Sequence, residues 1–522
     1  MKCLNIVAFI VLVTVCACNN NQSADKHAAS TGGFDSTYRP SFHFTAKANW
    51  INDPNGLVYY KDNYHLFFQY NPFGDQWGHM SWGHATTKDL IKWEEQPVAI
   101  AEYANSNKDT IMVFSGTAVV DSFNSAGFGS SASGMPLVAI YTSNVVNGVQ
   151  LAQNQSMAHS LDGNTFKVYD KNPVLDIQSK EFRDPKVFWH TASKKWVMIV
   201  VKSVDHLVQF YGSANLKKWS LLSEFGKIGD TARVWECPDI FELPVTNEPG
   251  KSKWVVTLSA GHPQKTYLAM QYFTGSFDGK KFTADTLNYP FYLDQGKDFY
   301  AGITYNNLPP TDKRTIMIGW ANSWEYAKNL PLRVFRGMMA IPRSLSLIKT
   351  TRGYTLVQQP VEELNSYLGD VLFQQEVLEI NNTVNSLTKV TGAALDIQFT
   401  LSKTDAAKAG LKLFKNGEQQ TPVYFDKAEK AIKLDRTHSG NISFSKRFPS
   451  IEWVNIDEEE NIQFRILVDK SLVEVFVNDG RYTLTDQVYP TANGHVEFFA
   501  ENGGATFTNV IIRAIRPSMH VK

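Results

Sequence analysis

Short apolar runs alternate with turn-forming segments along most of the chain. Runs rich in β-branched and aromatic residues occur at residues 64–70, 137–141, 196–201 and 254–258. Such runs are typical of β-strands. No amphipathic helical pattern of useful length interrupts them. The pattern therefore predicts an all-β protein.

One seven-residue phrase recurs four times between these runs. It reads Ser/Thr, any residue, Asp/Asn, Gly/Leu, any two residues and an aromatic residue, and it begins at Thr87, Ser160, Ser213 and Ser276, at intervals of 73, 53 and 63 residues. An Asp or Asn side chain can bond its own backbone in a tight turn, so each phrase predicts a hairpin turn in a recurring β unit. Units of this length are typical of propeller blades, and residues 39–350 would hold about five. Unrelated hairpins that share common turn chemistry are the alternative.

The pattern changes near residue 351. Residues 351–369 predict a linker with one short helix, because Pro360 and two Glu residues stand where a first helical turn would begin. Beyond it, residues 462–468 and 472–477 show period-2 alternation, with turns at short intervals. These features predict a β-sandwich over residues 370–522. The expected fold is a five-bladed β-propeller followed by a C-terminal β-sandwich.

The N-terminus has the pattern of an export signal. Residues 1–18 contain one Lys, an apolar run and then small residues, and the run is shorter than the roughly 20 residues that span a bilayer. The end of this segment resembles a bacterial lipoprotein cleavage box with Cys18 as the lipidated residue; Cys16 follows the bulkier Val15 and fits less well. An ordinary signal peptide that contains Cys is the alternative. Residues 19–38 are small and polar and predict a flexible tether.

We therefore expect an exported bacterial lipoprotein that meets the membrane only through its lipid anchor, on the periplasmic side or at the cell surface. Once Cys18 is lipidated, Cys237 is the only unmodified thiol left, which excludes an intramolecular disulfide. The chain carries 51 basic and 51 acidic residues, and this balance argues against nucleic-acid binding. The oligomeric state stays open.

Three acidic residues stand out as candidate catalytic groups. Asp53 and Asp184 each precede a proline, and Glu236 lies two residues before another. Proline stiffens the chain, which suits a carboxylate that must hold its position. The same dipeptide chemistry in Glu248-Pro249 belongs to a plain loop, so each motif alone is weak. The intervals of 131 and 52 residues nevertheless match about two blades and then one, which would bring the three to one end of a propeller, where paired carboxylates are typical of glycosidases.

Rival kinds of site have little support. The chain contains no HExxH, paired CxxC, GxSxG, P-loop or EF-hand motif. His79 and His84 have metal-ligand chemistry, although structural or hydrogen-bonding roles explain them better. We therefore expect no metal and no cofactor.

Six motifs, taken together, carry a family resemblance: WINDPNG (50–56), FFQYNP (67–72), FSGT (114–117), FRDP (182–185), ECPD (236–239) and IGWANSWEYA (318–327). As a set they resemble glycoside hydrolase family 32, which holds invertases, inulinases, levanases and fructan exohydrolases. The resemblance implies the same propeller and sandwich. It also implies that Asp53 is the nucleophile, Glu236 the general acid/base and Asp184 the stabiliser of the transition state.

The resemblance further implies a set of sugar-binding residues at matching positions: Asn52, Gln69, Trp77, Ser115, Arg183 and Trp320. A structural role is the alternative for each of them. For Trp320 in particular, the alternative is burial in the core of a blade.

The expected activity is that of a retaining β-fructosidase acting on fructans such as levan or inulin, or on sucrose-type fructosides, with exo attack favoured. Endo attack and fructosyl transfer to a sugar acceptor use the same carboxylates and stay open, as does the linkage preference. An arabinan-cleaving propeller enzyme is disfavoured by the WINDPNG and ECP motifs. A glycan-binding propeller without catalysis is the non-enzymatic alternative.

Overall fold

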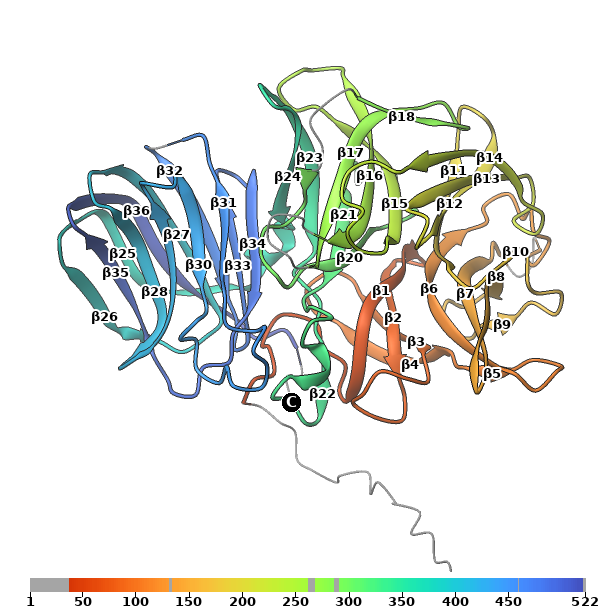
Figure 1. Cartoon of the computed structure of the whole chain (residues 1–522), viewed down its shortest axis with the longest axis horizontal. Helices are drawn as coiled ribbons and strands as arrows, with labels where there is room; N and C mark the ends of the chain where they lie inside the picture. Colours follow the sequence, from red (N-terminus) through yellow and green to blue (C-terminus); the bar gives the residue numbers. More distant parts are fainter. Residues whose placement is uncertain (1–36, 131–133, 262–267, 286–290, 459, 520–522) are drawn as a thin grey trace, which may run out of the picture.

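The strands of the N-terminal part form a ring of sheets, and those of the C-terminal part form a sandwich beside it (Figure 1). The computed structural model describes residues 37–130, 134–261, 268–285, 291–458 and 460–519. The predicted signal, Cys18 and residues 19–36 of the predicted tether lie outside the described residues. Within the described ranges the helices are two short 3-10 segments, η1 (Ala327–Asn329) and η2 (Glu362–Tyr367), and no helix is long and apolar enough to cross a membrane.

Five sheets of mostly antiparallel strands make up the ring in the described part of the chain. The first sheet contains β1 (Asn49–Tyr60), β2 (Asn63–Asn71), β3 (Ser81–Thr87), β4 (Glu94–Ile100) and β22 (Phe335–Arg336), and the second contains β5 (Tyr103–Ala104), β6 (Thr110–Val120), β7 (Leu137–Asn147), β8 (Val149–Ser160), β9 (Lys167–Val168) and β10 (Leu175–Ser179). The third contains β11 (Phe182–His190), β12 (Lys195–Lys202), β13 (Leu207–Ser213) and β14 (Ser220–Gly226). The fourth contains β15 (Glu236–Pro244), β16 (Ser252–Gly261), β17 (Leu268–Phe277), β18 (Phe282–Ala284) and β19 (Phe291–Tyr292), and the fifth contains β20 (Tyr300–Thr304), β21 (Thr315–Trp320), β23 (Arg343–Thr350) and β24 (Gly353–Pro360).

One strand of each sheet lines the centre of the ring. Contacts run in a closed cycle from β1 to β6, β11, β15, β20 and back to β1. The backbone closes the ring in two places: β22 pairs in parallel with β1, and Asn306 exchanges backbone hydrogen bonds with Leu57 and Tyr59. The predicted five-bladed propeller is thus present, and its five inner strands converge on one axis.

The four repeated phrases are hairpin turns, as predicted. Each joins the third strand of a blade, counted from the centre of the ring, to the antiparallel strand that follows it. The pairs are β3–β4, β8–β9, β13–β14 and β17–β18. In every case the Asp or Asn side-chain oxygen accepts two backbone N–H bonds from residues two and three positions later, as Asp89 does from Ile91 and Lys92. This local bond explains why the phrase recurs once per blade in the first four blades.

The predicted domain limits stay a prediction, with one difference inside the predicted linker. Residues 353–360 form β24, which pairs with β23 along its whole length. The sequence signal was missed because β24 is an outer strand, on which buried and exposed positions are mixed. The short helix η2 follows β24 and leads into the sandwich.

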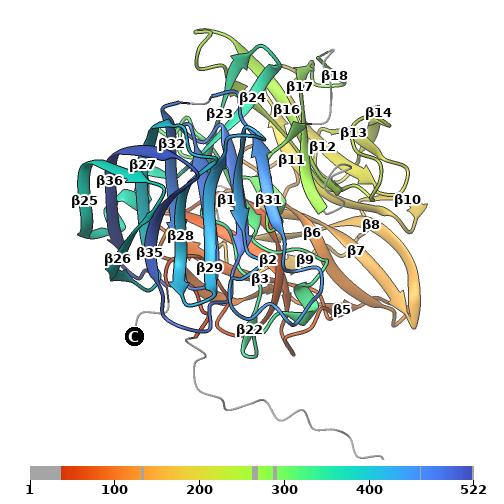
Figure 2. The same cartoon turned by 60° about the vertical axis from the view of Figure 1, so that its left-hand side comes forward.

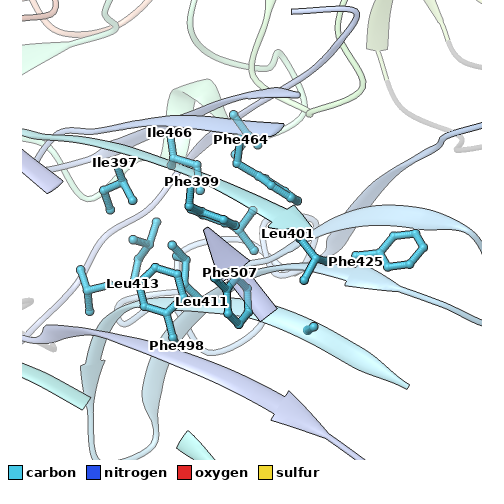
Figure 3. Close-up of a cluster of buried hydrophobic side chains, with 14 of the residues drawn as sticks. Ile397, Phe399, Leu401, Leu411, Leu413, Phe425, Phe464, Ile466, Phe498 and Phe507 are labelled. Atoms are coloured by element: carbon cyan, nitrogen blue, oxygen red, sulfur yellow. The ribbon is translucent and has the colours of Figure 1, made fainter. Parts of the chain in front are cut away.

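Two six-stranded sheets form the sandwich, which Figure 2 brings forward. One contains β25 (Leu368–Asn381), β27 (Leu395–Thr404), β32 (Ile462–Val468), β33 (Leu472–Val477), β34 (Tyr482–Gln487) and β36 (Gly504–Ile515), and the other β26 (Val384–Thr391), β28 (Lys408–Asn416), β29 (Gln419–Asp426), β30 (Ala431–Asp435), β31 (Ile451–Asn455) and β35 (His495–Glu501). Their facing sides meet in one apolar core, where the Phe399 ring stacks on Phe464 at 4.7 Å and meets Phe498 edge-on at 5.4 Å (Figure 3). Such aromatic pairs add about 0.5–1.5 kcal/mol beyond area burial.

The sandwich packs firmly against the propeller. Leu467 and Phe476 belong to the same apolar cluster as Phe42 and Ile318 of the propeller side. A fully buried Leu or Phe contributes about 1.5–3 kcal/mol. The interface is therefore a core in its own right and holds the two parts in one arrangement.

Candidate active site

All five inner strands carry the same kind of irregularity. Each has one extra residue relative to its partner strand, between Ile51 and Pro54 in β1, Val113 and Gly116 in β6, Arg183 and Lys186 in β11, Glu236 and Asp239 in β15, and Tyr300 and Ile303 in β20. A bulge of this kind bends the strand and redirects its side chains. These bulges contain or adjoin Asp53, Ser115, Asp184, Glu236 and Tyr300, so they bring side chains from all five blades together.

Three of the bulges contain a residue with left-handed backbone geometry. Asp184 has φ 62°, Cys237 has φ 47° and Ala301 has φ 54°. Non-glycine residues adopt this region at a cost of about 1–3 kcal/mol each. The surrounding blades must hold them there, and this kind of strain is concentrated at functional sites.

Asp53 lies on β1 and is held from three sides. Asn52 Nδ2 donates to its Oδ1 at 3.0 Å, and Ser115 Oγ donates to its Oδ2 at 2.6 Å. Trp50 Nε1 in turn donates to Asn52 Oδ1 at 2.7 Å, which orients the amide. Asp53 keeps 9 % of its surface exposed. The carboxylate is thus fixed in position and still reachable.

Glu236 begins β15 and is the most exposed of the three carboxylates, with 25 % of its side chain accessible. Tyr300 OH donates to Glu236 Oε2 at 2.8 Å. Arg183 NH2 lies 3.4 Å from Glu236 Oε1, and its NH1 pairs with Glu181 at 2.6 Å. Two donors from other blades therefore orient Glu236 while one side of it stays open.

Cys237 lies between the other two carboxylates. Its buried Sγ is 3.5 Å from Asp53 Oδ2 and 3.7 Å from Asp184 Oδ2, and its backbone N–H donates to Asp184 Oδ2 at 3.0 Å. One thiol has a single proton, so it can donate to only one of the carboxylates at a time. Burial and the surrounding carboxylates raise the pKa of this thiol well above its ordinary value. Cys237 therefore acts here as a neutral donor that links Asp53 to Asp184.

The structure also gives the places of the remaining candidates. Asn52, Ser115 and Arg183 contact the carboxylates as described above. Gln69 is buried on β2 and donates to the Val113 carbonyl at 3.0 Å, next to the bulge of β6. Trp77 lies outside the strands with 38 % of its surface exposed and packs edge-on against Phe114 at 6.1 Å.

Trp320 is fully buried, which matches the structural alternative for it. Its ring lies 4.9 Å from Trp324 and 6.2 Å from Trp50, so it supports the residues that flank Asn52. Its Nε1 has no hydrogen-bond partner among the described residues.

The histidines considered as metal ligands have other partners. His84 bonds His65 at 2.9 Å, and His79 pairs with Glu102 at 2.6 Å. In the part of the chain that the structure describes, no group of three or more His, Cys, Asp or Glu side chains has the arrangement of a metal site.

Asp184 has a strongly perturbed titration. Burial raises its pKa to about 7, and Glu236 and Asp53 add to this effect against the opposing influence of Arg183. In the unfolded chain the group ionises near pH 3.8. The folded state therefore binds one more proton than the unfolded state between these values, and the free energy of unfolding falls as pH rises through the window.

Replacing Asp184 by Asn should remove this pH dependence. We expect the melting temperature of Asp184→Asn to rise relative to that of the wild type as pH goes from 4 towards 7, since Asn carries no charge to desolvate. Asp176→Asn, which removes a carboxylate from the exposed part of β10, is the matched control. A difference between the wild type and Asp184→Asn that does not change with pH would contradict the assignment.

A buried relay from the second blade holds the backbone of Asp184. Its N–H donates to Thr142 Oγ1 at 2.9 Å, Thr142 donates to Gln155 Oε1 at 2.9 Å, and Gln155 Nε2 donates to the Phe182 carbonyl at 2.9 Å. Thr142 and Gln155 are fully buried. The relay thus fixes both sides of the bulge in β11.

Thr142→Val should therefore lower kcat by roughly 10- to 100-fold, because small displacements of an active-site group are costly. Ser143→Ala is the matched control: it removes a comparable buried bond, from Ser143 Oγ to Ser156 Oγ at 2.8 Å, that does not touch residues 182–184. We expect both variants to lose similar stability in urea denaturation and only Thr142→Val to lose turnover. Equal kcat values for the two would argue against a positioning role.

Sequence reasoning missed Tyr300, Cys237 as a donor, and the Thr142–Gln155 relay. Tyr300 carried a usable signal, since it follows Glu236 by 64 residues, about one blade. The relay carried none, because Thr142 and Gln155 lie on neighbouring strands of another blade and resemble ordinary strand residues.

Comparisons with known proteins agree with this architecture. The model of the glycosyl hydrolases family 32 N-terminal domain matches residues 43–360, and that of the family 32 C-terminal domain matches residues 363–514. The chain is 41 % identical over 504 residues to a levanase of Bacillus subtilis, covering 95 % of this chain and 72 % of that protein, and 40 % identical over 527 residues to an extracellular exo-inulinase of Aspergillus niger, covering 95 % and 96 %. The crystal structure of an exo-inulinase from Aspergillus awamori superposes with a TM-score of 0.87 at 37 % identity, covering 93 % of this chain and all of that one. The chain therefore belongs to glycosyl hydrolase family 32 and is a glycoside hydrolase.

Proposed function

We propose that this protein hydrolyses the fructosyl linkages of fructans or of sucrose-type fructosides. The observation that carries the proposal is the grouping of three carboxylates. Asp53 and Asp184 both contact Cys237 Sγ, and Glu236 contacts Arg183 and Tyr300. Relatives named levanase, exo-inulinase and invertase support the choice of sugar.

The carboxylates would act by double displacement with retained configuration. Asp53 attacks the anomeric carbon of the fructosyl unit while Glu236 transfers its proton to the departing oxygen, which breaks the glycosidic bond and leaves a fructosyl ester on Asp53. Glu236, now a carboxylate facing Arg183 and Tyr300, then takes a proton from water, and that water releases fructose and restores Asp53.

Asp184 is the residue that we propose as the transition-state stabiliser. It is held by backbone bonds on both sides of its bulge, so its carboxyl group is preorganised for the ring hydroxyls of the sugar. Asn52, Gln69, Trp77, Ser115, Arg183 and Trp320 are proposed as the residues that bind or support the terminal fructosyl unit. Of these, Trp77 is the most exposed, and it packs edge-on against Phe114, the neighbour of Ser115.

Product analysis on inulin and levan tests the proposal. Release of fructose alone indicates exo attack, which we favour, and a ladder of oligosaccharides indicates endo attack. Products longer than the substrate in a sucrose incubation would show transfer to sugar acceptors. Cleavage of arabinan without cleavage of any fructoside would contradict the proposed substrate.

We also propose that the protein is exported and anchored by a lipid on Cys18. The relatives include proteins named as extracellular, and the expected cleavage box ends at Cys18. In a bacterial host, Cys18→Ala should move the protein from the membrane fraction to the soluble fraction, whereas the matched variant Cys16→Ala should leave it membrane-bound. Equal fractionation of the two variants would remove Cys18 as the anchor.

A further inference from the structure

A buried cluster of polar side chains cross-links three of the inner strands and has no part in the proposed reaction. It consists of Lys186 on β11, Asp239 on β15 and Thr304 at the end of β20, all of them buried. Lys186 Nζ lies 3.3 Å from Asp239 Oδ2. Thr304 Oγ1 joins the two, because it donates to Asp239 Oδ2 at 2.8 Å and accepts from Lys186 Nζ at 3.1 Å. The backbone of Thr304 repeats both links: its N–H donates to Asp239 Oδ2 at 2.6 Å, and its carbonyl accepts from Lys186 Nζ.

The three strands of the cluster are those that carry the proposed acid/base and the two donors that contact it. Glu236 begins β15, Arg183 lies on β11 and Tyr300 begins β20. Each cluster residue follows its counterpart on the same strand by three or four residues, roughly 10–13 Å along an extended chain. The bulge of each strand lies between the two. The cluster therefore fixes the three strands just past the bulges that aim the catalytic groups.

Asn306, which follows β20, extends these links across the ring. Its Nδ2 donates to the Val187 carbonyl of β11 at 3.1 Å and to the Ala118 carbonyl of β6 at 2.9 Å. Thr304 and Asn306 together tie the end of the fifth blade to the inner strands of the second, third and fourth blades. The inner strands are thus held in one register relative to one another by side chains as well as by packing.

Stability alone does not account for a buried ion pair in this place. Moving an ammonium and a carboxylate out of water costs about as much as their attraction returns, and apolar side chains of the same volume are often at least as stable. Burial lowers the pKa of Lys186, against the opposing effect of Asp239, so keeping the ammonium charged here has a cost. Directional bonds among buried polar groups can instead select one arrangement of the elements that they join.

We propose that this cluster positions Glu236 relative to Arg183 and Tyr300, and so aims the proton of Glu236 at the departing oxygen. The inference rests on the proposed function, because it takes Glu236 to be the acid/base. Lys186, Asp239 and Thr304 are positioning residues, since they act through the strands that carry the reacting groups. Damage to the cluster should impair proton transfer to the leaving group more than it impairs attack on the anomeric carbon.

The test compares kcat on sucrose, whose leaving group needs a proton, with kcat on para-nitrophenyl fructoside, whose leaving group needs little protonation. Lys186→Met keeps most of the side-chain volume and removes the charge. We expect its ratio of sucrose turnover to aryl fructoside turnover to fall about tenfold. Lys412→Met is the matched control, because Lys412 forms a largely buried ion pair with Glu497 at 3.1 Å within the sandwich. Its ratio should stay within about twofold of the wild-type value.

A pair of variants at Thr304 keeps the test decisive if Lys186→Met does not fold. Thr304→Val preserves the shape of the side chain but removes the hydroxyl that joins Lys186 to Asp239, whereas Thr304→Ser keeps that hydroxyl. We expect the ratio to fall about threefold to tenfold for Thr304→Val, the value of one hydrogen bond. For Thr304→Ser it should stay within about twofold of the wild-type value.

A wild-type ratio in Thr304→Val, or in folded Lys186→Met, would overturn the inference even if turnover fell, because equal losses on both substrates indicate a purely structural role. A ratio that falls as far in Thr304→Ser as in Thr304→Val would overturn it as well. Wild-type protein that cleaves neither substrate would instead refute the proposed function, which keeps the two failures distinct.

Discussion

Asp53→Ala and Glu236→Ala are each expected to abolish most fructoside hydrolysis while leaving the protein folded. Loss of the nucleophile should lower kcat by at least about 10⁴-fold, because no other group can form the covalent intermediate. Loss of the acid/base should lower it by about 10²- to 10⁴-fold, the usual contribution of a positioned proton donor. Initial rates on sucrose and inulin measure both effects, and thermal melts followed by circular dichroism check the fold.

The two roles can be separated by changing the leaving group. An aryl fructoside whose phenol leaves readily as an anion needs little protonation, so Glu236→Ala should lose much less activity on it than on sucrose. Asp53→Ala should lose the same on both, since attack on the anomeric carbon is required in each case.

Glu248→Gln provides the control for these variants. Glu248 also precedes a proline in the fourth blade, but it lies in a turn and pairs with Lys251 at 2.9 Å. It has no part in the proposed reaction. Its kcat and KM should match the wild type. Equal losses for Glu236→Ala on the two kinds of substrate would reject Glu236 as the proton donor.

Arg343→Met is expected to lower the free energy of unfolding by about 3–5 kcal/mol, the usual cost of leaving a buried charge unpaired. Arg343 is fully buried at the contact between propeller and sandwich, where it binds Asp294 at 2.9 Å and Glu474 at 2.8 Å. Glu474 in turn bonds His43 at 3.0 Å, and His43 bonds Asp469 at 3.0 Å. Met preserves most of the side-chain volume, so the measured loss would report mainly on the unpaired carboxylates.

Urea denaturation measures this effect, with Arg352→Met as the matched control. Arg352 pairs with Asp457 on the surface, where both side chains are more than half exposed, and such pairs contribute about 0–1 kcal/mol. A loss of less than about 1 kcal/mol for Arg343→Met would show that the buried network adds little to stability.

The same network gives the stability a pH dependence in the alkaline range. Burial alone would lower the pKa of His43, but its bonds to Asp469 and Glu474 raise it from 6.5 to about 9. The stabilisation is thus complete below pH 6.5 and is lost as pH rises through about 9, because the folded state binds the extra proton in that window. The wild type should lose stability between pH 7 and 9.5 relative to His43→Gln, and parallel curves for the two proteins would exclude His43 as the titrating group.

Strand β33 shows which structural features the sequence pattern predicts and which it does not. Its alternation Leu-Val-Glu-Val-Phe-Val predicted a strand, and Val473, Val475 and Val477 indeed face the core of the sandwich. The pattern alone does not show whether the opposite face, which carries Glu474, meets water or protein. In the structure that face is buried too, since His43 and Arg343 arrive from the propeller to neutralise Glu474.

The three carboxylates show the same difference between what the sequence predicts and what only the structure reveals. The blade-length intervals between Asp53, Asp184 and Glu236 predicted that they meet at one end of the ring, and the structure does bring them together. The intervals contained no information about the bulges in β1, β11 and β15, which aim the side chains, or about Cys237 as the link between two of them.

By itself, the sequence determined the features that depend on near neighbours in the chain: the strands, the hairpin turns in which Asp89 and its counterparts bond their own backbone, the number of blades and the family motifs. Only the tertiary structure decided which polar groups are buried, how Thr142 holds Asp184, and how strongly the pKa values of Asp184 and His43 are shifted. The physical reason is that hydrogen bonds, desolvation and charge pairing at these places involve partners tens to hundreds of residues away, whereas turn chemistry and alternation act within a few residues.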